Sequence, residues 1–361
     1  MSNTNQIASN KINTGRFFEN FTMNEVIQHA TPRTITAGDA SLYIALTGAR
    51  NPLHCSEPFA HSLGYASMPI DDLLVFHIAF GKTVPDISVN AVANLGYADV
   101  RFLQPVFVGD TLTTSSTVIG LKQNSNGKNG VVYVHSTAVN QNQQAVLSWI
   151  RWVMVHKEDL NIPAPETVIP ELPAYVTASN LRIPQQLSAQ CFENQATAGK
   201  NYWEDYQSGE RINHPAGITI NNSDHSLATR LYQNNARLHF DNHLMQSSPF
   251  GKRLIYGGIV ISACRTLSYE GLENALAILA INGGTHANPC FAGDTIYTFS
   301  EVLDRWKLNN RKDIGALRLR MLGIKNITPA EITEIKTADG YHPNIVLDLD
   351  YTVLMPRKGN E

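Results

Sequence analysis

The sequence predicts an α+β protein built from two tandem copies of one unit, each an antiparallel sheet wrapped round a central helix. The first observation is a repeat. A polar turn ending in His54 or His239 precedes an apolar run beginning at Ile70 or Ile255, and both pairs are 185 residues apart. The second is the order within each copy, where one helical pattern precedes several stretches of β-branched and aromatic residues. A repeat of this length indicates a duplicated domain, because solenoid repeats are only about 20 to 50 residues long.

The elements of the first copy follow from local patterns. Apolar residues recur at spacings of three and four after Asp39, whose carboxylate can complement the N-terminus of the predicted helix. The apolar segment 70–80 is predicted to be the buried central helix, and Gly81 is expected to end it. The pattern then changes to strands joined by Asn- and Gly-containing turns. The three predicted antiparallel strands cover residues 113–121, 131–139 and 146–155.

A proline-rich segment separates the two copies. Five prolines fall within residues 157–185, and proline removes backbone donors and favours an extended chain, so we expect a semi-rigid linker there. Residues 17–156 and 186–357 are each expected to form one domain, and residues 1–16 a disordered tail. The second copy has predicted strands at 297–303, 315–323 and 345–355, with a longer insertion near residues 328–342.

Composition and charge exclude several classes of protein. The formal net charge is −3 and only 16% of residues are charged, so no nucleic-acid partner is expected. No apolar run reaches the roughly 20 residues needed to span a membrane, so no membrane partner is expected either. The four cysteines lie far apart without a CxxC pair, which argues against a zinc site and a disulfide framework and favours a cytoplasmic protein. No cofactor is expected, because the sequence has no Gly-rich nucleotide-binding fingerprint and no cluster of metal ligands.

Several motifs of the repeated unit resemble those of a known family. The turn 48–54, the Pro69-Ile70 pair and the run 105–112 are similar to the MaoC-like (R)-specific enoyl-CoA hydratases. This resemblance implies that each copy has the hotdog fold, so that the whole chain is a double hotdog. The chain resembles more closely the mesaconyl-CoA hydratase (β-methylmalyl-CoA dehydratase) subfamily. The stretches that support this closer resemblance are 70–77, 81–88, 228–234 and 349–356.

The resemblance implies the reversible addition of water to mesaconyl-CoA, giving (2R,3S)-β-methylmalyl-CoA, with a CoA thioester as the partner. That chemistry needs donors for the thioester enolate, a base for the water and an acid for the α-proton. In the family motif an Asp and a His five residues apart share the proton transfers. The first copy has Ala49 at the Asp position, whereas the second has Asn234, which can hold water but is not a base. We therefore expect the second copy to be catalytic, with His239 as acid and base and Asn234 orienting the water.

Five further residues are expected to bind the substrate. Mesaconyl-CoA has a free carboxylate beside its double bond, and Arg237 lies two residues before His239, where the family motif has proline. Arg237 is therefore the candidate for a bidentate pair with that carboxylate, and the alternative is a structural salt bridge. The first copy is expected to shape the acyl pocket, although His54 could equally be structural and Asp72 could complement a helix dipole. The full set of binding candidates is Arg237, Arg50, His54, Asp72 and Tyr232.

Other functions stay open on the sequence alone. The chain could hydrate plain (R)-3-hydroxyacyl chains, or it could be a silent acyl-CoA-binding module, because both copies lack the motif Asp. A hotdog thioesterase is a further alternative, although the Asn-Pro-x-His turn is not its usual signature. Lys252 and Arg253 are candidates for the CoA phosphates. Duplication can supply the hotdog pair within one chain, so the oligomeric state, including a homo-oligomer, is left open.

Overall fold

A single eleven-stranded sheet passes through both copies in the computed structural model, which describes residues 11–358. The predicted disordered tail falls outside this range up to residue 10, and residues 11–16 contain no helix or strand. The strands of the first half are β1 (Val26–Gln28), β2 (Arg33–Thr34), β3 (Ala91–Phe102), β4 (Thr111–Gln123), β5 (Asn129–Val139) and β6 (Ala145–His156). Those of the second half are β7 (Arg211–Thr219), β8 (Ile278–Thr285), β9 (Thr295–Lys307), β10 (Ile314–Lys325) and β13 (Ile345–Pro356).

The strand order shows how the halves are joined. It runs β1-β4-β5-β6-β3-β8-β13-β10-β9-β7, with β2 paired to β4. All six predicted strands are present as β4, β5, β6, β9, β10 and β13, with ends shifted by at most four residues. The junction is formed by two strands that the prediction missed, since β3 pairs antiparallel with β8 from Tyr97 opposite Gly284 to Arg101 opposite Ala280. β3 contains three Ala, one Gly, one Asn and one Asp, which are depleted in strands, and its first half does not alternate between buried and exposed positions, so it lacks the usual strand signal.

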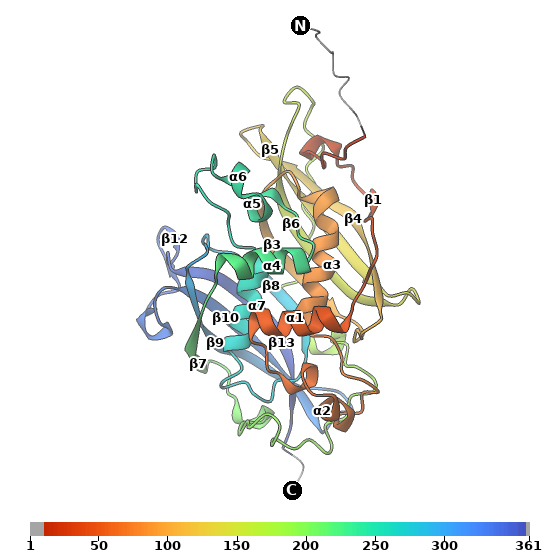
Figure 1. Cartoon of the computed structure of the whole chain (residues 1–361), viewed down its shortest axis with the longest axis vertical. Coiled ribbons are helices and arrows are strands. Elements are labelled where there is room, and N and C mark those ends of the chain that lie inside the picture. The colour runs from red at the N-terminus through yellow and green to blue at the C-terminus, as the bar shows by residue number, and fades with distance from the viewer. Residues whose placement is uncertain (1–10, 359–361) are drawn as a thin grey trace.

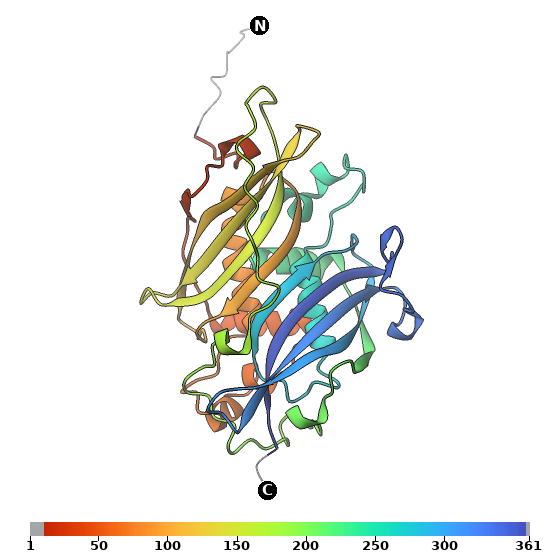
Figure 2. The same cartoon turned by 180° about the vertical axis from the view of Figure 1, so that it is seen from behind.

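One sheet crosses both halves, so the sheet itself does not mark where one domain ends. We propose residues 17–156 and 186–357 as the two hotdog units. Segment 157–185 runs across the outer face of the sheet (Figure 2) and contains only a single β-bridge, Leu121 to Val168, and one short 3-10 turn. The predicted insertion near residues 328–342 contains a 3-10 turn (Pro329–Glu331) and a two-stranded ribbon of β11 (Lys336–Thr337) and β12 (Gly340–Tyr341).

The long helices gather on the other face of the sheet (Figure 1). Two of them are the central helices of the copies, α3 (Asp72–Ile87) and α7 (Gly257–Leu267). α1 (Ala37–Thr47) and α4 (Asn222–Leu231) precede them in equivalent positions. Shorter helices are α2 (Glu57–Ser62), α5 (Arg237–Phe240) and α6 (Asn242–Met245). One apolar core includes residues of all four long helices and of both halves of the sheet, so the halves are packed as one body.

The prediction that Gly81 ends the first central helix is wrong. α3 continues six residues further, to Ile87, and Gly81 lies buried in its middle. A Cβ atom at Gly81 would stand 1.9 Å from the carbonyl oxygen of Tyr232. The glycine is therefore needed where the chain after α4 passes close to α3, and not for a left-handed helix cap. This role depends on a tertiary contact, which a local helix-stop signal does not report.

Equivalent residues of the two central helices meet each other. His77 of α3 and Ser262 of α7 are 185 residues apart, which makes them counterparts in the repeat, and Nε2 of His77 lies 2.9 Å from Oγ of Ser262. Both residues are buried. Contact between counterparts indicates that the copies face each other across an approximate twofold axis, as the subunits of a symmetric dimer do.

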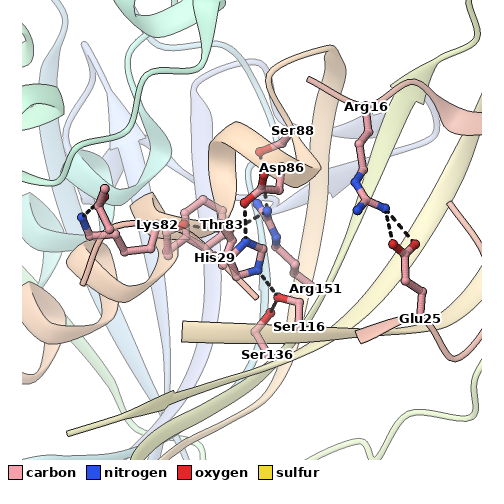
Figure 3. Close-up of polar contacts among 12 residues, drawn as sticks. Arg16, Glu25, His29, Lys82, Thr83, Asp86, Ser88, Ser116, Ser136 and Arg151 are labelled. Carbon is pink, nitrogen blue, oxygen red and sulfur yellow. Dashed lines mark hydrogen bonds and ion pairs between the residues drawn. The ribbon is translucent and has the colours of Figure 1, made fainter. Parts of the chain in front are cut away.

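A buried histidine network also occurs in both halves. In the first half, His29 Nδ1 lies 2.8 Å from a carboxylate oxygen of Asp86, and its Nε2 lies 2.8 Å from Oγ of Ser116 (Figure 3). In the second half, His214 uses its Nε2 in the same way on Ser300, at 2.9 Å, and its Nδ1 on the Glu270 carbonyl. The Ser-His-carboxylate order of the first network is that of a hydrolase triad. The second half repeats only the Ser-His pair and has a backbone carbonyl in place of the carboxylate, which indicates that the histidines are structural.

Candidate active site

The main cavity of the site lies between the two halves. It has a volume of about 270 Å³ and is bordered by α3, β3 and β6 of the first half and by the chain around α5, α7 and β8 of the second. Most of its wall is apolar, as expected for a site that holds an acyl chain. Its polar lining residues include Ser88, Asn94, Tyr97, Arg151, Asn234, His239, Tyr256, His286 and Asn288.

His239 is held in one orientation by the backbone. Its Nδ1 lies 2.9 Å from the carbonyl oxygen of Leu254, and because a carbonyl can only accept, Nδ1 carries the proton. Nε2 of the neutral ring then has a free lone pair. Burial lowers the pKa of His239 to about 4, so the ring is neutral at pH 7 and can take a proton. His239 thus lies in the cavity wall in the form that a general base requires.

Asn234 lies on the same cavity, five residues before His239. Its side chain is buried and its Oδ1 accepts a hydrogen bond from the backbone N–H of Ala236 at 3.2 Å. The turn out of α4 is made possible by Gln233, which has the left-handed φ of 53°. The structure therefore brings together the two residues that the sequence predicts to be catalytic. The carboxamide can hold a water molecule but cannot deprotonate it.

The N-terminus of α7 also opens on this cavity. Gly257 is its first residue and lines the wall, and no side chain caps the helix end. A Cβ atom at Gly257 would stand 2.1 Å from Cε1 of His286, so any other residue would force the imidazole ring to move. The first N–H groups of a helix lack intrahelical partners and carry the positive end of the helix dipole. An oxyanion of a bound thioester would find a donor at this point.

Three aromatic residues complete this end of the cavity, and the sequence analysis did not select them. Nε2 of His286 lies 3.1 Å from the hydroxyl oxygen of Tyr97, and burial lowers the pKa of His286 to about 4. Tyr256 is the N-cap residue of α7, and its hydroxyl group is buried. Burial raises its pKa well above the usual value, so it stays a neutral donor. The repeat offset is a signal that could have found it, because Tyr256 is the counterpart of Asp71.

Arg151 and Asn94 form the polar part of the wall on the side of the first half. Arg151 is completely buried in β6, and Nη2 of its guanidinium donates to Oγ1 of Thr83 at 2.8 Å (Figure 3). Burial lowers the pKa of Arg151 to about 10, which leaves the group charged at neutral pH. Arg151 is not among the candidates predicted from the sequence. A signal was present, because Arg151 stands between Trp149 and Val153 at an inward position of an alternating strand.

The other predicted binding residues lie elsewhere. Arg50, His54 and Asp72 line a separate, much smaller cavity of about 20 Å³, which is also bordered by residues of the second half such as Arg265 and Tyr269. Arg50 is already paired with Glu270 at 2.7 Å, and both side chains are about half exposed. Arg237 is exposed at the start of α5 and does not line the main cavity. Tyr232 is buried behind the wall, where its ring lies 4.7 Å from the ring of His77. Their binding roles thus have no support from the geometry and stay predictions.

Within residues 11–358 no group of three or more His, Cys, Asp or Glu side chains has the arrangement of a metal site. None of the helices in the same range is long and apolar enough to cross a membrane.

Comparisons with known proteins place the chain among the MaoC-like dehydratases and hydratases. The MaoC like domain family matches residues 18–140. The chain is 56% identical to a β-methylmalyl-CoA dehydratase of Chloroflexus aurantiacus, over 97% of this chain and all of that protein. It is 52% identical to a mesaconyl-CoA hydratase of Cereibacter sphaeroides, over 96% of this chain and all of that protein.

Solved structures confirm the predicted α+β double hotdog. A MaoC domain dehydratase of Chloroflexus aurantiacus superposes with a TM-score of 0.95 at 54% identity, covering 97% of this chain and 100% of the other. A Mycobacterium tuberculosis protein described as a double hotdog superposes with a TM-score of 0.74 at 22% identity, covering 95% of this chain and 99% of the other. At that identity the second likeness shows the fold alone.

Proposed function

The chain belongs to the MaoC-like family, in the branch of the β-methylmalyl-CoA dehydratases and mesaconyl-CoA hydratases, and we propose that it reversibly hydrates mesaconyl-CoA. The product is (2R,3S)-β-methylmalyl-CoA, as expected for the hydratase subfamily that the sequence resembles. The observation that carries the proposal is the meeting of a neutral histidine, His239, with the uncapped N-terminus of α7 in one cavity. A base for water and a donor for a thioester oxyanion are the two groups that hydration of an enoyl-CoA needs.

In the proposed mechanism the thioester oxygen accepts a hydrogen bond from the N–H of Gly257. Asn234 holds a water molecule beside His239, whose Nε2 takes a proton as the water oxygen bonds to the β-carbon. The electron pair of the double bond moves onto the thioester, and the helix N-terminus stabilises the enolate. The α-carbon then receives a proton from the imidazolium, which restores neutral His239. Dehydration follows the same steps in reverse, so no redox cofactor is needed.

Supporting roles are proposed for residues at the opening of the cavity. Phe250 lines the cavity and is partly exposed, so it marks one edge. Lys252 follows it in the chain and stands with Nζ 4.3 Å above the ring of Phe291. Nη2 of Arg253 is held by Oδ1 of Asn222 at 2.5 Å. Of the two candidates for the CoA phosphates, we favour Lys252, because the structure gives it no ionic partner within residues 11–358.

A cytoplasmic location is proposed as well, and a homo-oligomer is an assembly to be tested. All four cysteines are free thiols, two of them exposed, which fits a reducing compartment. Light scattering coupled to gel filtration would measure the oligomeric state directly.

The experiment that tests the function is a hydration assay with the purified protein. Mesaconyl-CoA should lose the absorbance of its conjugated double bond, and the product should be β-methylmalyl-CoA. Crotonyl-CoA, which lacks the free carboxylate, tests for a plain-chain hydratase. Hydration of crotonyl-CoA at an equal or higher rate would overturn the assignment. Binding of both thioesters without any loss of absorbance would indicate a non-catalytic module.

The pH dependence of the same assay tests the base. Because burial lowers the pKa of His239 to about 4, kcat/KM should stay high as the pH falls below 6.5 and decline only as the imidazole becomes protonated near pH 4. Circular dichroism at each pH would check that the protein is folded. A decline centred near pH 6.5 in folded protein would contradict a buried, neutral His239 as the base.

A further inference from the structure

We propose that Arg151, assisted by Asn94, binds the free carboxylate of the substrate and so makes the site specific for CoA thioesters with a carboxylate on the β-carbon. This inference deepens the proposed hydratase function and rests on it. It also replaces Arg237, the arginine expected from the sequence, which does not line the cavity, with one that does.

The first observation is that Arg151 is a buried cation without a counterion. Its contacts are two hydroxyl oxygens, Oγ1 of Thr83 at 2.8 Å and Oγ of Ser88 at 3.5 Å, and the ring of Phe80, which lies 4.3 Å from the guanidinium carbon. Nη2 makes both hydrogen bonds. Nε and Nη1, which carry three of the five N–H donors of an arginine, have no acceptor within residues 11–358. A buried charge left in this way is destabilising, so a reason for its presence is required.

Other partly buried arginines of the same sheet are paired with carboxylates. Arg318 forms an ion pair with Asp350 at 2.5 Å, and Arg320 forms one with Asp348 at 2.7 Å. These pairs join β10 to β13 and are the usual structural use of arginine in this protein. Arg151 is more deeply buried than either, yet no ion pair to it is found in the described part of the chain. The contrast indicates that its anion comes from a ligand.

Asn94 has the same property on the neighbouring strand. Both polar atoms of its side chain are buried and without a hydrogen-bond partner in the range described. The register of β3 against β6 places Asn94 opposite Val153 and Tyr97 opposite Arg151, so the amide and the guanidinium lie within a few residues of each other on adjacent strands. Both residues line the main cavity together with His239. Two unsatisfied polar groups on one cavity wall are a site for a polar ligand group.

The chemistry of the substrate requires such a group. In a β-methylmalyl thioester the free carboxylate is bonded to the β-carbon, the atom that gains or loses the hydroxyl group. The carboxylate must therefore enter the same cavity as His239, away from solvent. A desolvated carboxylate needs a positive partner, and arginine is the side chain best matched to it in geometry. A plain enoyl thioester has a methyl group at this position and would leave Arg151 unpaired.

The test compares two arginines with two pairs of thioesters. Arg151→Met removes the charge and keeps much of the side-chain volume, and Arg237→Met is the matched control on the exposed candidate. Hydration of mesaconyl-CoA and of crotonyl-CoA is measured for each variant. We expect Arg151→Met to lower kcat/KM for mesaconyl-CoA at least 100-fold more than for crotonyl-CoA. Arg237→Met should leave the ratio between the two substrates within about threefold of the wild-type value.

Binding measurements keep the test independent of catalysis. Succinyl-CoA has a carboxylate on the β-carbon and no double bond, and butyryl-CoA has a methyl group there. Calorimetry should show that the wild-type protein binds succinyl-CoA more tightly than butyryl-CoA. In Arg151→Met the ratio of these two affinities should fall at least tenfold. A wild-type protein that has this preference but does not hydrate mesaconyl-CoA would refute the proposed function and retain the carboxylate site.

Stability measurements separate a binding role from a structural one. If Arg151 is unpaired until a ligand binds, Arg151→Met should unfold at the same temperature as the wild type or at a higher one, because the substitution removes a buried unpaired charge. Arg151→Lys serves if the Met variant does not fold, and its mesaconyl-to-crotonyl ratio should fall at least tenfold, because one ammonium cannot replace the fork of arginine. Equal losses on both substrates, or a ratio changed only by Arg237→Met, would overturn the proposal.

Discussion

The N-termini of the two central helices occupy equivalent places in the two halves but have opposite chemistry. In the first half, the carboxylate of Asp71 caps α3 by accepting from the N–H of Leu73 at 2.9 Å. Asp72, the next residue, accepts from the N–H of Ile278 at 2.8 Å. In the second half the counterparts, 185 residues later, are Tyr256 and Gly257, and α7 has no side-chain cap.

The cavities beside the two helix ends differ accordingly, with about 20 Å³ at the N-terminus of α3 and about 270 Å³ at that of α7. The positive end of a helix favours an anion. In the first half the protein supplies that anion itself, so the place for an oxyanion is already occupied. In the second half that place is open, and we propose that the substrate occupies it. Two differences at the start of the helix, Asp71 against Tyr256 and Asp72 against Gly257, thus distinguish the filled helix end from the open one.

The histidines of the two halves are held alike, so the difference does not arise from them. Nδ1 of His54 lies 3.1 Å from the carbonyl oxygen of Pro69, as Nδ1 of His239 lies 2.9 Å from that of Leu254. Nε2 of His54, however, stands 3.9 Å from a carboxylate oxygen of Asp72, and His239 has no such neighbour in the described range. The two imidazole rings are therefore held in the same way and differ in the group that lies near Nε2.

The largest expected effect is on His239. Replacing it by Ala should lower kcat for mesaconyl-CoA about 1,000-fold, because the general base is lost. His54→Ala, the same change in the other half, should lower kcat less than tenfold. The rates are measured by the absorbance of the double bond, with thioester binding by calorimetry as a check on the site. Equal losses in the two variants would break the distinction between the halves.

Gly257 gives the next largest effect. Gly257→Ala should reduce kcat about 100-fold, because its Cβ would collide with His286, 2.1 Å away, and displace a donor of the oxyanion site. Asp72→Gly at the equivalent position of α3 should have a much smaller effect on kcat. Circular dichroism and thermal unfolding would show whether Gly257→Ala remains folded. A folded Gly257→Ala variant with wild-type kcat would exclude this helix end from the reaction.

The buried histidine networks of the two halves should contribute similarly to stability and not to catalysis. His29→Ala and His214→Ala each remove a partner of a buried serine hydroxyl, so each should reduce the free energy of unfolding by roughly 2 kcal/mol. Urea unfolding monitored by tryptophan fluorescence would measure both values. Neither variant should lose hydration activity per folded molecule. Loss of activity in folded His29→Ala would show that the Ser-His-Asp arrangement has a chemical role.

The smallest effect concerns Asp72 and depends on pH. Burial raises the pKa of Asp72 to about 6, so the folded protein is penalised for its charge above that pH and not below the unfolded pKa near 4. Asp72→Asn should therefore stabilise the protein by about 1–2 kcal/mol at pH 8, and the gain should disappear as the pH falls to 4. Thermal unfolding at both pH values measures this. A destabilised Asn variant at pH 8 would mean that the hydrogen bond to Ile278 requires the charge.

The sequence by itself determined the duplication, the central helices and six of the strands. These follow from periodicity and from a fixed offset, which are local properties of the chain and survive without any knowledge of packing. The position of Asn234 and His239 on one cavity could be predicted for the same reason, because residues five apart across one turn stay close in space. The family motif added the expected chemistry, which the comparisons with close relatives support.

Only the tertiary structure decided which helix end is open, where the two halves join and which arginine is left without a carboxylate. Gly81 illustrates the reason, because its requirement comes from the carbonyl of Tyr232, about 150 residues away in the chain. Arg151 is a second case. A charged residue in a strand is ordinary on the solvent face and exceptional on the buried one, and the packing of two halves against each other determines which face is buried.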